Sequence, residues 1–310
     1  MALGNHSTVI ELFLLGLPVD HHIQVLLFVL FLAICLFALS GNLLMILFIR
    51  ANSHLHAPTY FFLSHFSFLD LCCSSVTVPK MLENILSEKK TISVEDCLTQ
   101  AFFVFDSGGR ELCLLAVMAY DRYAAICYPL LYGQMMSNEL CVGLVWGSWG
   151  LAFLDGFINT LLAWNLDFCE TQVISNFICE IPSLFPPSCS NSSNNFEAFL
   201  FSVLLHAFGT FLLVFSYARI ISTILSISST LGRSKAFSTC SSHLTAVTLF
   251  YGSGLLRCLM PISGSPCELV FSMQYCVITP LVNPLVYSLK NKELKASLKN
   301  MLQKNLQHLR

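Results

Sequence analysis

The sequence predicts an all-α membrane protein, in which seven membrane-spanning helices form one bundle and a short interfacial helix follows. Composition is the first observation behind this prediction: 55% of the 310 residues are hydrophobic, 11% are charged, and the mean hydropathy is +0.70. A soluble domain carries about 25% charged residues, so most of this chain does not face water. The second observation is that long apolar runs recur along the whole chain with short polar breaks, which favours one domain over residues 1–310.

Seven apolar runs are long enough for the predicted helices, since crossing the hydrocarbon of a bilayer takes about 20 mostly apolar residues. Backbone groups in lipid must bond within their own segment, which favours helices, whereas a membrane β-barrel would show segments of about 10 alternating residues. The runs are Ile23–Ile49, Pro58–Pro79, Leu98–Ala119, Leu140–Leu166, Phe196–Ala218, Ala236–Met260 and Leu269–Leu289.

Basic residues predict the orientation of the bundle. Residues 1–24 contain no Lys or Arg, so we expect tail 1–22 to be extracellular, bundle 23–289 to follow, and tail 290–310 to be cytoplasmic, in the plasma membrane. The cytoplasmic side then holds Arg50, Arg122, Arg219, Arg233, Lys235, Lys290, Lys292, Lys295, Lys299, Lys304 and Arg310. The outer loops hold fewer basic residues: Lys80, Lys89, Lys90 and, near the last loop, Arg257. No cleavable signal opens the chain, so we expect the first helix to act as the targeting signal. Lys290–Gln303 is basic and amphipathic, as expected of an interfacial helix.

Sequons and cysteines agree with this orientation. Asn5 and Asn191 are N-x-Ser glycosylation acceptors on the predicted outer face, Asn191 being the weaker candidate. Four cysteines also fall outside, and extracellular cysteines oxidise, but spacing does not choose among their three pairings. They are Cys97, Cys169, Cys179 and Cys189. Cys267, in the third outer loop, has no assigned role.

Polar residues inside the predicted helices mark a candidate site, because such residues are costly in lipid. Two carboxylates and two amides at mid-depth could hold a sodium ion or share a proton, or could form a hydrogen-bond network that packs the helices. They are Asn42, Asp70, Glu111 and Asn283. We assign no firm metal site and no other cofactor.

Further charges lie in the predicted helices, among them Arg257 at the outer end of the sixth and Glu197 near the start of the fifth. Asp106 and Arg110 are four residues apart on one helix, so we expect them to neutralise each other. Asp155 and Arg257 have no partner that the sequence identifies.

Two short motifs mark the predicted cytoplasmic side. Asp121-Arg122-Tyr123 ends the third helix, where an Arg beside an acid can pair with it in one state and reach a partner protein in another. Asn283-Pro284-x-x-Tyr287 ends the seventh helix, and a Pro there frees a backbone carbonyl and bends the helix. We interpret both motifs as parts of a conformational switch.

Taken together, these segments resemble the olfactory receptor family of rhodopsin-like G-protein-coupled receptors over about the whole chain. The strings that carry the resemblance are LHAPTYFFLS at Leu55–Ser64, SFLD at Ser67–Asp70, MAYDRYAAIC at Met118–Cys127, SY at Ser216–Tyr217, KAFSTCSSHL at Lys235–Leu244 and PLVNPLVYSL at Pro280–Leu289. The MAYDRY and KAFSTC strings are specific to odorant receptors. The length of the outer loop is similar to that of the tetrapod-type (class II) branch.

The resemblance implies several roles. It pairs Cys97 with Cys179 and Cys169 with Cys189, and it matches Asp70 and Glu111 to the family's buried acids. It assigns the switch and G-protein-coupling region to Asp121, Arg122, Tyr123, Tyr217, Lys235, His243, Pro284 and Tyr287. The implied partners are an odorant small molecule, the olfactory stimulatory heterotrimeric G protein, which raises cAMP, and membrane lipid.

Helical spacing and the resemblance place a ligand pocket among the outer halves of the third, fifth, sixth and seventh helices. On the third helix, the positions on the same face as Glu111 are Val104, Phe105, Gly108 and Gly109. The resemblance adds Phe201, Ser202, Leu205, His206, Tyr251, Leu255, Cys258, Met273 and Cys276. The two glycines either deepen the cavity or let another helix pack closely, and His206 either donates to a ligand or packs.

The sequence departs from the family pattern at three places. Asn176 stands where His is usual in the outer loop, and Ala57 and Thr59 stand where Thr and Met are usual. Cys258 replaces a pocket aromatic, commonly Tyr, so that contact is lost. Val104 stands where amine receptors carry an Asp, which disfavours cationic amine ligands.

These features favour a receptor for small, mostly apolar volatile molecules, bound by apolar burial with micromolar affinity. The alternative is a rhodopsin-like receptor for a non-volatile lipid, peptide or metabolite outside the olfactory system. A retinal pigment needs a Schiff-base Lys, which Leu269–Leu289 lacks. The chain shows no internal repeat, HExxH, GxSxG or phosphate loop, so we expect neither a transporter nor an enzyme. The net charge of −2 gives no sign of a nucleic-acid surface.

Overall fold

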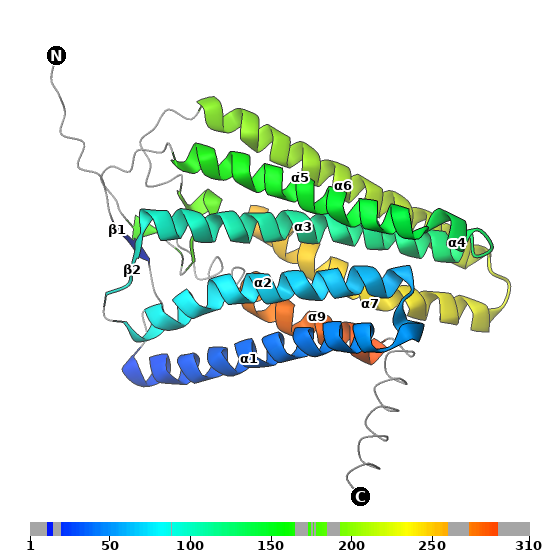
Figure 1. Cartoon of the computed structure of the whole chain (residues 1–310), viewed down its shortest axis with the longest axis horizontal. Helices are drawn as coiled ribbons and strands as arrows, with labels where there is room; N and C mark the ends of the chain where they lie inside the picture. Colours follow the sequence, from blue (N-terminus) through cyan, green and yellow to red (C-terminus); the bar gives the residue numbers. More distant parts are fainter. Residues whose placement is uncertain are drawn as a thin grey trace, which may run out of the picture.

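The protein is a bundle of long helices lying side by side, as the sequence predicts (Figure 1). The computed structural model describes residues 11–14, 20–87, 89–164, 173–174, 176, 178–184, 193–259 and 273–290. Its helices are α1 (His21–Ala51), η1 (Ser53–Leu55), α2 (Pro58–Leu86), α3 (Val94–Cys127), α4 (Tyr132–Met135), α5 (Asn138–Trp164), η2 (Ile181–Leu184), α6 (Ser193–Ser226), α7 (Thr230–Leu259), η3 (Gln274–Ile278) and α9 (Thr279–Lys290).

The predicted apolar runs correspond to the long helices, and the all-α fold class is confirmed. By length and hydropathy, four helical segments of the described residues could cross a membrane: α1, α2, α5 and Leu200–Ser226 of α6. Large apolar side chains are exposed along the outside of these helices; Leu26, Phe37 and Leu44 on α1 are each more than 60% exposed. Such a surface fits hydrocarbon as the surrounding medium.

Helix α3 lies at the centre of the bundle, in contact with α2, α5, α6 and α7. Small residues allow the close approach. A Cβ on Gly109 would lie 3.1 Å from Cβ of Ala152 on α5, and a Cβ on Gly209 of α6 would lie 2.7 Å from Cδ2 of Leu112. Interfaces between membrane helices use small residues in this way, because van der Waals packing drives their association.

Most helices extend beyond their predicted apolar runs, and α2 and α3 show how. Helix α2 continues past Pro79 to Leu86, so the predicted end at that proline is wrong. Prolines are tolerated inside membrane helices because neighbouring groups satisfy the freed carbonyl. Helix α3 begins at Val94, where the Ser93 hydroxyl accepts a hydrogen bond of 3.0 Å from the backbone N–H of Asp96 and caps the helix.

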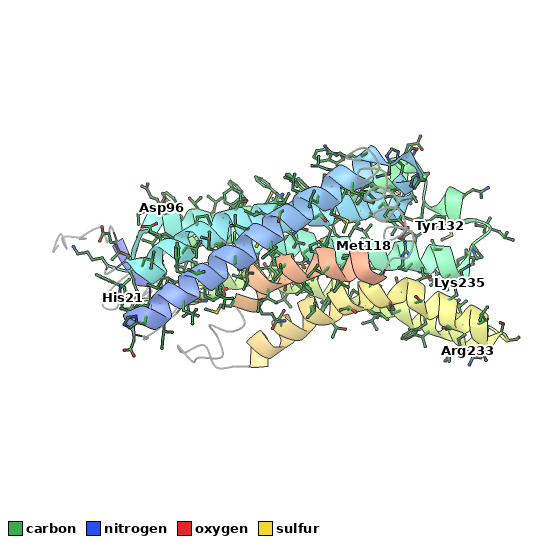
Figure 2. The ribbon with its side chains drawn as sticks, turned by 90° about the horizontal axis from the view of Figure 1, so that it is seen from below. His21, Asp96, Met118, Tyr132, Arg233 and Lys235 are labelled. Carbon is green, nitrogen blue, oxygen red and sulfur yellow. A yellow bond between two sulfur atoms is a disulfide. The ribbon has the colours of Figure 1, made fainter. Side chains whose placement is uncertain are left out.

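A small sheet that the sequence did not predict covers the start of α3. Strand β1 (Glu11–Leu14) pairs antiparallel with β2 (Thr91–Ser93) and parallel with β3 (Val173–Ile174). Leu12 and Leu14 are buried in a cluster that contains Cys97 and Cys179. We call this the disulfide end of the bundle, and the opposite end, where α3 finishes, the Arg122 end. Figure 2 shows Asp96 near the first and Tyr132, Arg233 and Lys235 at the second.

The seventh spanning segment begins irregularly. Its described part opens at Met273, passes through the π-helix η3 and continues as α9 with Pro284 inside. In a π-helical turn the backbone hydrogen bonds span five residues instead of the four of an α-helix. Such turns are frequent at functional sites. The first residues of the predicted run and the predicted interfacial helix lie outside the described residues.

Candidate functional site

At the Arg122 end, one buried carboxylate collects donors from three helices. Asp121 is 1% exposed and forms an ion pair with Arg122, whose Nε lies 3.0 Å from Oδ2. The Thr59 hydroxyl on α2 donates to the same oxygen at 2.9 Å, and Arg122 Nη2 donates to Thr59 Oγ1. The Tyr132 hydroxyl on α4 donates to Oδ1 at 2.7 Å. This network ties α2, α3 and α4 together in the described conformation.

Tyr132 is suited to its place in this network. Its burial and the neighbouring Asp121 carboxylate raise the pKa of Tyr132, because both disfavour a phenolate. The hydroxyl therefore stays protonated and donates. Neither Thr59 nor Tyr132 was among the predicted switch residues, although Thr59 was already a departure from the family string.

A second contact at this end joins α6 to α7. The Tyr217 hydroxyl and His243 Nδ1 are 2.6 Å apart, and the two rings stack with centroids 5.7 Å apart. Both side chains are buried. Tyr287 is also buried and packs edge-on against Phe66. The structure thus brings three predicted switch residues into the core of this end.

The other predicted switch residues lie around these contacts. Pro284 of α9 faces Gly41 of α1, where a Cβ would lie 3.5 Å from the proline ring. Tyr123 is partly exposed beside Tyr120 and Tyr128. Lys235 is exposed near the start of α7 (Figure 2).

The predicted acid cluster is assembled in part. Asn283 Nδ2 lies 3.1 and 3.3 Å from the two carboxylate oxygens of Asp70. Glu111 is buried and close enough to interact with Asp70 and the Tyr275 hydroxyl. Asn42 instead donates to the backbone carbonyls of Ala38 at 3.0 Å and Pro280 at 2.8 Å. In the part of the chain that the structure describes, no three His, Cys, Asp or Glu residues are grouped to hold a metal ion.

The predicted pocket residues divide by position. Val104, Gly109, Ser202 and Cys276 are buried, and Phe105, Gly108, Leu205, His206, Tyr251 and Met273 are partly buried. Phe201 is 36% exposed on α6, so it does not share the buried position of Ser202. The side chains of Leu255 and Cys258 lie outside the described residues.

The two glycines of α3 lie against other helices. Gly109 abuts Ala152 of α5, and a Cβ on Gly108 would lie 3.3 Å from the Tyr275 hydroxyl. Of the two interpretations of Gly108 and Gly109, close packing is therefore the one that the structure supports.

The disulfide end contains the cystine implied by the resemblance. Cys97 of α3 is bonded to Cys179, with their Cα atoms 5.3 Å apart. The side chain of Gln100 accepts a hydrogen bond of 2.8 Å from the Cys179 backbone N–H. Cys169, Cys189, Cys267 and both glycosylation acceptors, Asn5 and Asn191, lie outside the described residues, as does the side chain of Arg257.

Comparison with known proteins decides the family. The sequence profile described as "Olfactory receptor" matches residues 31–305. The chain belongs to the olfactory receptor family. This receptor is 67% identical to human olfactory receptor 8S1 over 95% of its own length and 82% of the relative. It is 45% identical to olfactory receptor 1E5 of Pan troglodytes over 97% and 96%.

A solved structure supports the fold of the receptor. Squid rhodopsin superimposes with a TM-score of 0.70 over 93% of this chain and 87% of the rhodopsin chain, at 16% identity. The family makes the chain a multi-pass plasma-membrane receptor and not an enzyme.

One polar cluster of the receptor was missed from sequence. Asp155 of α5 is fully buried, and its Oδ1 accepts from the Ser202 hydroxyl of α6 at 2.6 Å and from Asn159 Nδ2 at 3.1 Å. Asn159 also donates to Ser202 Oγ at 2.9 Å. His206 Nδ1 donates to the Ser202 carbonyl at 2.7 Å. The predicted pocket residue Ser202 is therefore held by α5, a helix outside the predicted pocket, and His206 is held within α6 itself.

The expected neutralisation of Asp106 by Arg110 is confirmed. Arg110 Nη2 lies 2.8 Å from Asp106 Oδ2, and the guanidinium carbon sits 4.6 Å from the centroid of the Trp149 ring. The ion pair and the cation–π contact together shelter the arginine between α3 and α5.

Proposed function

We propose that the receptor binds small, mostly apolar volatile molecules within the bundle and activates the olfactory stimulatory G protein, which raises cAMP. The network around Asp121 and Arg122 carries this proposal. It gathers the strongest polar contacts of the Arg122 end in one place, next to the Tyr217–His243 contact between α6 and α7. An agonist that binds better to an arrangement without the network would shift the population toward that arrangement and free Arg122.

We also propose the orientation of the receptor. The N-terminus lies outside the cell with the disulfide end, and the Arg122 end and the C-terminus face the cytoplasm. Support comes from the excess of Lys and Arg near the Arg122 end and from the Cys97–Cys179 bond, since disulfides persist in oxidising compartments.

The acid cluster is proposed as a site for a sodium ion or a shared proton. Asp70 and Glu111 are both buried, and carboxylates in a low-dielectric interior are costly to charge without a compensating cation. If sodium fills this role, replacing extracellular sodium by choline should shift the agonist concentration that gives half-maximal cAMP, and Asp70→Asn should abolish that shift.

A cAMP reporter assay in transfected cells, run against a broad panel of volatiles, tests the proposed function. We expect responses to apolar volatiles in the micromolar range. Responses confined to lipids, peptides or non-volatile metabolites would favour the alternative receptor class. Arg122→Ala should abolish agonist-driven cAMP at matched surface expression, whereas Arg50→Ala, at the same end but outside the network, should not. Undiminished signalling in Arg122→Ala would refute the role assigned to this residue.

A further inference from the structure

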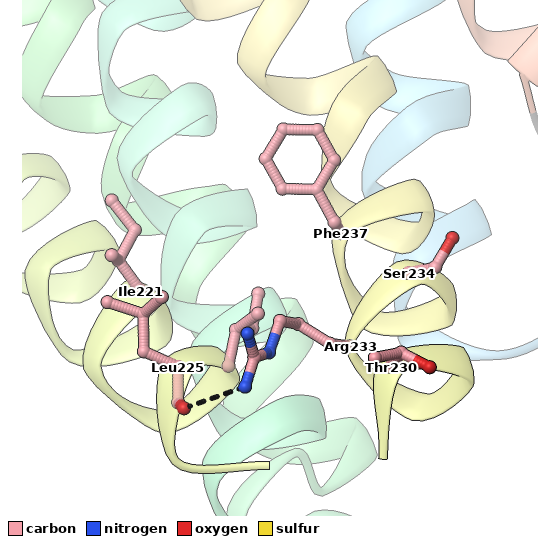
Figure 3. Close-up of a pocket in the computed structure, with 7 residues that line it drawn as sticks. Ile221, Leu225, Thr230, Arg233, Ser234 and Phe237 are labelled. Carbon is pink, nitrogen blue, oxygen red and sulfur yellow. Dashed lines mark hydrogen bonds between the residues drawn. The ribbon is translucent and has the colours of Figure 1, made fainter. Parts of the chain in front are cut away.

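A groove opens between α6 and α7 at the Arg122 end (Figure 3). Its volume is about 500 Å³, and its walls are mostly apolar. Leu225 and Phe237, from its two sides, are 63% and 59% exposed, and Ile221 is 53% exposed. In a membrane protein, an apolar surface at this position faces acyl chains rather than water.

One cation lies in this apolar groove. Arg233 reaches across it from α7, and its Nη2 donates to the carbonyl oxygens of Leu225 at 3.3 Å and Ile227 at 3.0 Å (Figure 3). A guanidinium carries five N–H donors, so several remain for another acceptor. Among the described residues, no carboxylate lies within ion-pair distance of Arg233.

The two helices that form the groove carry charge of one sign over this part of the chain. Between Glu197 and Glu268 the sequence contains no acidic residue, whereas Arg219, Arg233 and Lys235 lie on the parts of α6 and α7 next to the groove. The groove therefore combines a positive potential with an apolar channel. Basic pockets between helices on the cytoplasmic side of membrane proteins suit anionic lipid headgroups.

We propose that this groove binds an anionic phospholipid of the cytoplasmic leaflet. The lipid phosphate accepts hydrogen bonds from Arg233, and an acyl chain lies along Ile221, Leu225 and Phe237. An arginine matches a phosphate because its planar N–H groups can bind two oxygens at once. The assignment of the leaflet rests on the orientation proposed above.

Native mass spectrometry tests the proposal by counting the lipids that the receptor retains after release from nanodiscs. Nanodiscs of mixed phosphatidylserine and phosphatidylcholine present the same lipids to both faces, so the result does not depend on orientation in cells. We expect the wild type to retain phosphatidylserine preferentially. Arg233→Gln should weaken that preference roughly fivefold, because it removes the charge-assisted hydrogen bonds that hold the phosphate in the groove.

Matched variants separate the groove from general surface charge. Arg50→Gln removes an exposed cation from the last turn of α1, at the same end, and should leave the preference unchanged. Phe237→Ser should lower retention, whereas Leu44→Ser, at a lipid-facing position of α1, should not. Equal losses in Arg233→Gln and Arg50→Gln, or no loss in either, would overturn the proposal.

Two controls complete the experiment. Thermal unfolding of each variant in phosphatidylcholine alone shows whether it folds, and Arg233→Lys, which keeps the charge, should retain part of the preference if Arg233→Gln is unstable. Soluble glycerophosphoserine should not displace the lipid, because it has no acyl chain to fill the groove. If glycerophosphoserine displaced the lipid at equal concentration, the groove would be a site for a free phosphate ester, and the proposal of a lipid site would be refuted.

Discussion

At the scale of the residue, the single carboxylate of Asp121 joins three helices. Three donors from α2, α3 and α4 converge on it, and each is charge-assisted. Hydrogen bonds to charged groups are stronger than neutral ones, and a buried charge that loses a partner is costly. In the proposed mechanism, these contacts to Asp121 break before Arg122 becomes free.

Tyr132→Phe tests this arrangement. Removing the hydroxyl deletes one donor to Asp121 and should weaken the network by about 1 kcal/mol, roughly a fivefold change in the conformational equilibrium. We expect basal cAMP to rise at matched surface expression. Thr248→Val, which removes an exposed hydroxyl of α7 outside the network, is the control. Equal basal cAMP in both variants would mean that Tyr132 does not restrain the switch.

Asp155 permits a second prediction at this scale. In Asp155→Leu, the Ser202 hydroxyl and the Asn159 amide lose their shared acceptor, so the receptor should be destabilised by about 1–3 kcal/mol, seen as a lower thermal midpoint. Asp155→Asn keeps an acceptor oxygen and should retain most of the stability. If the two variants were equally unstable, the negative charge and not the hydrogen bonds would be the important property.

The residues of the candidate site were predictable from sequence where a motif brings them together along the chain. Asp121 and Arg122 are adjacent, and Asn283 is part of the motif that contains Pro284. Thr59 and Asp155 find their partners on other helices, 62 and 47 residues away. Apolar periodicity predicts which face of a helix is buried, but not how one helix is rotated against another. The contacts of Thr59 and Asp155 could therefore be found only from the structure.

At the scale of the element, the length of the apolar runs predicted the helices well, because crossing a bilayer requires a minimum length of apolar helix. The ends were less predictable, because caps and loops set them: Ser93 starts α3 earlier than its apolar run, and α2 runs through Pro79. The β1–β2–β3 sheet escaped prediction because its strands have at most four residues and pair across long stretches of chain. Short strands carry too little periodicity to be recognised.

Gly209→Ala tests the packing of α3 against α6. A methyl group at this position would lie 2.7 Å from Cδ2 of the buried Leu112, so overpacking should cost about 1–3 kcal/mol and lower the thermal midpoint of the purified receptor. Gly147→Ala is the matched control, since no atom lies within 4 Å of the added Cβ. Equal midpoints for the two variants would show that α6 can move away without cost.

At the scale of the whole molecule, the bundle is organised around α3, which reaches from the disulfide at one end to Arg122 at the other. In the proposed function a signal travels along this length, and the helices that α3 contacts carry the predicted pocket and switch residues. The bundle was predictable from composition and apolar runs, whereas its relative helix placement was not.

The orientation of the molecule can be tested directly. Epitope tags fused to the two ends of the receptor should behave differently in cells: the N-terminal tag should bind antibody on intact cells, and the C-terminal tag only after permeabilisation. An antibody against a cytosolic protein, which should bind only after permeabilisation, checks that the membrane is intact. Finding both terminal tags on one face would contradict an odd number of crossings.

The pairing of β1 with β3 has a consequence for biogenesis. Residues 11–14 leave the ribosome early, yet one of their two partner strands, 173–174, is synthesised only after the segments that become α1, α2, α3 and α5. The first strand therefore stays unpaired on that side until more than half of the chain has been synthesised. The complete sheet therefore forms only after those four helical segments have been made.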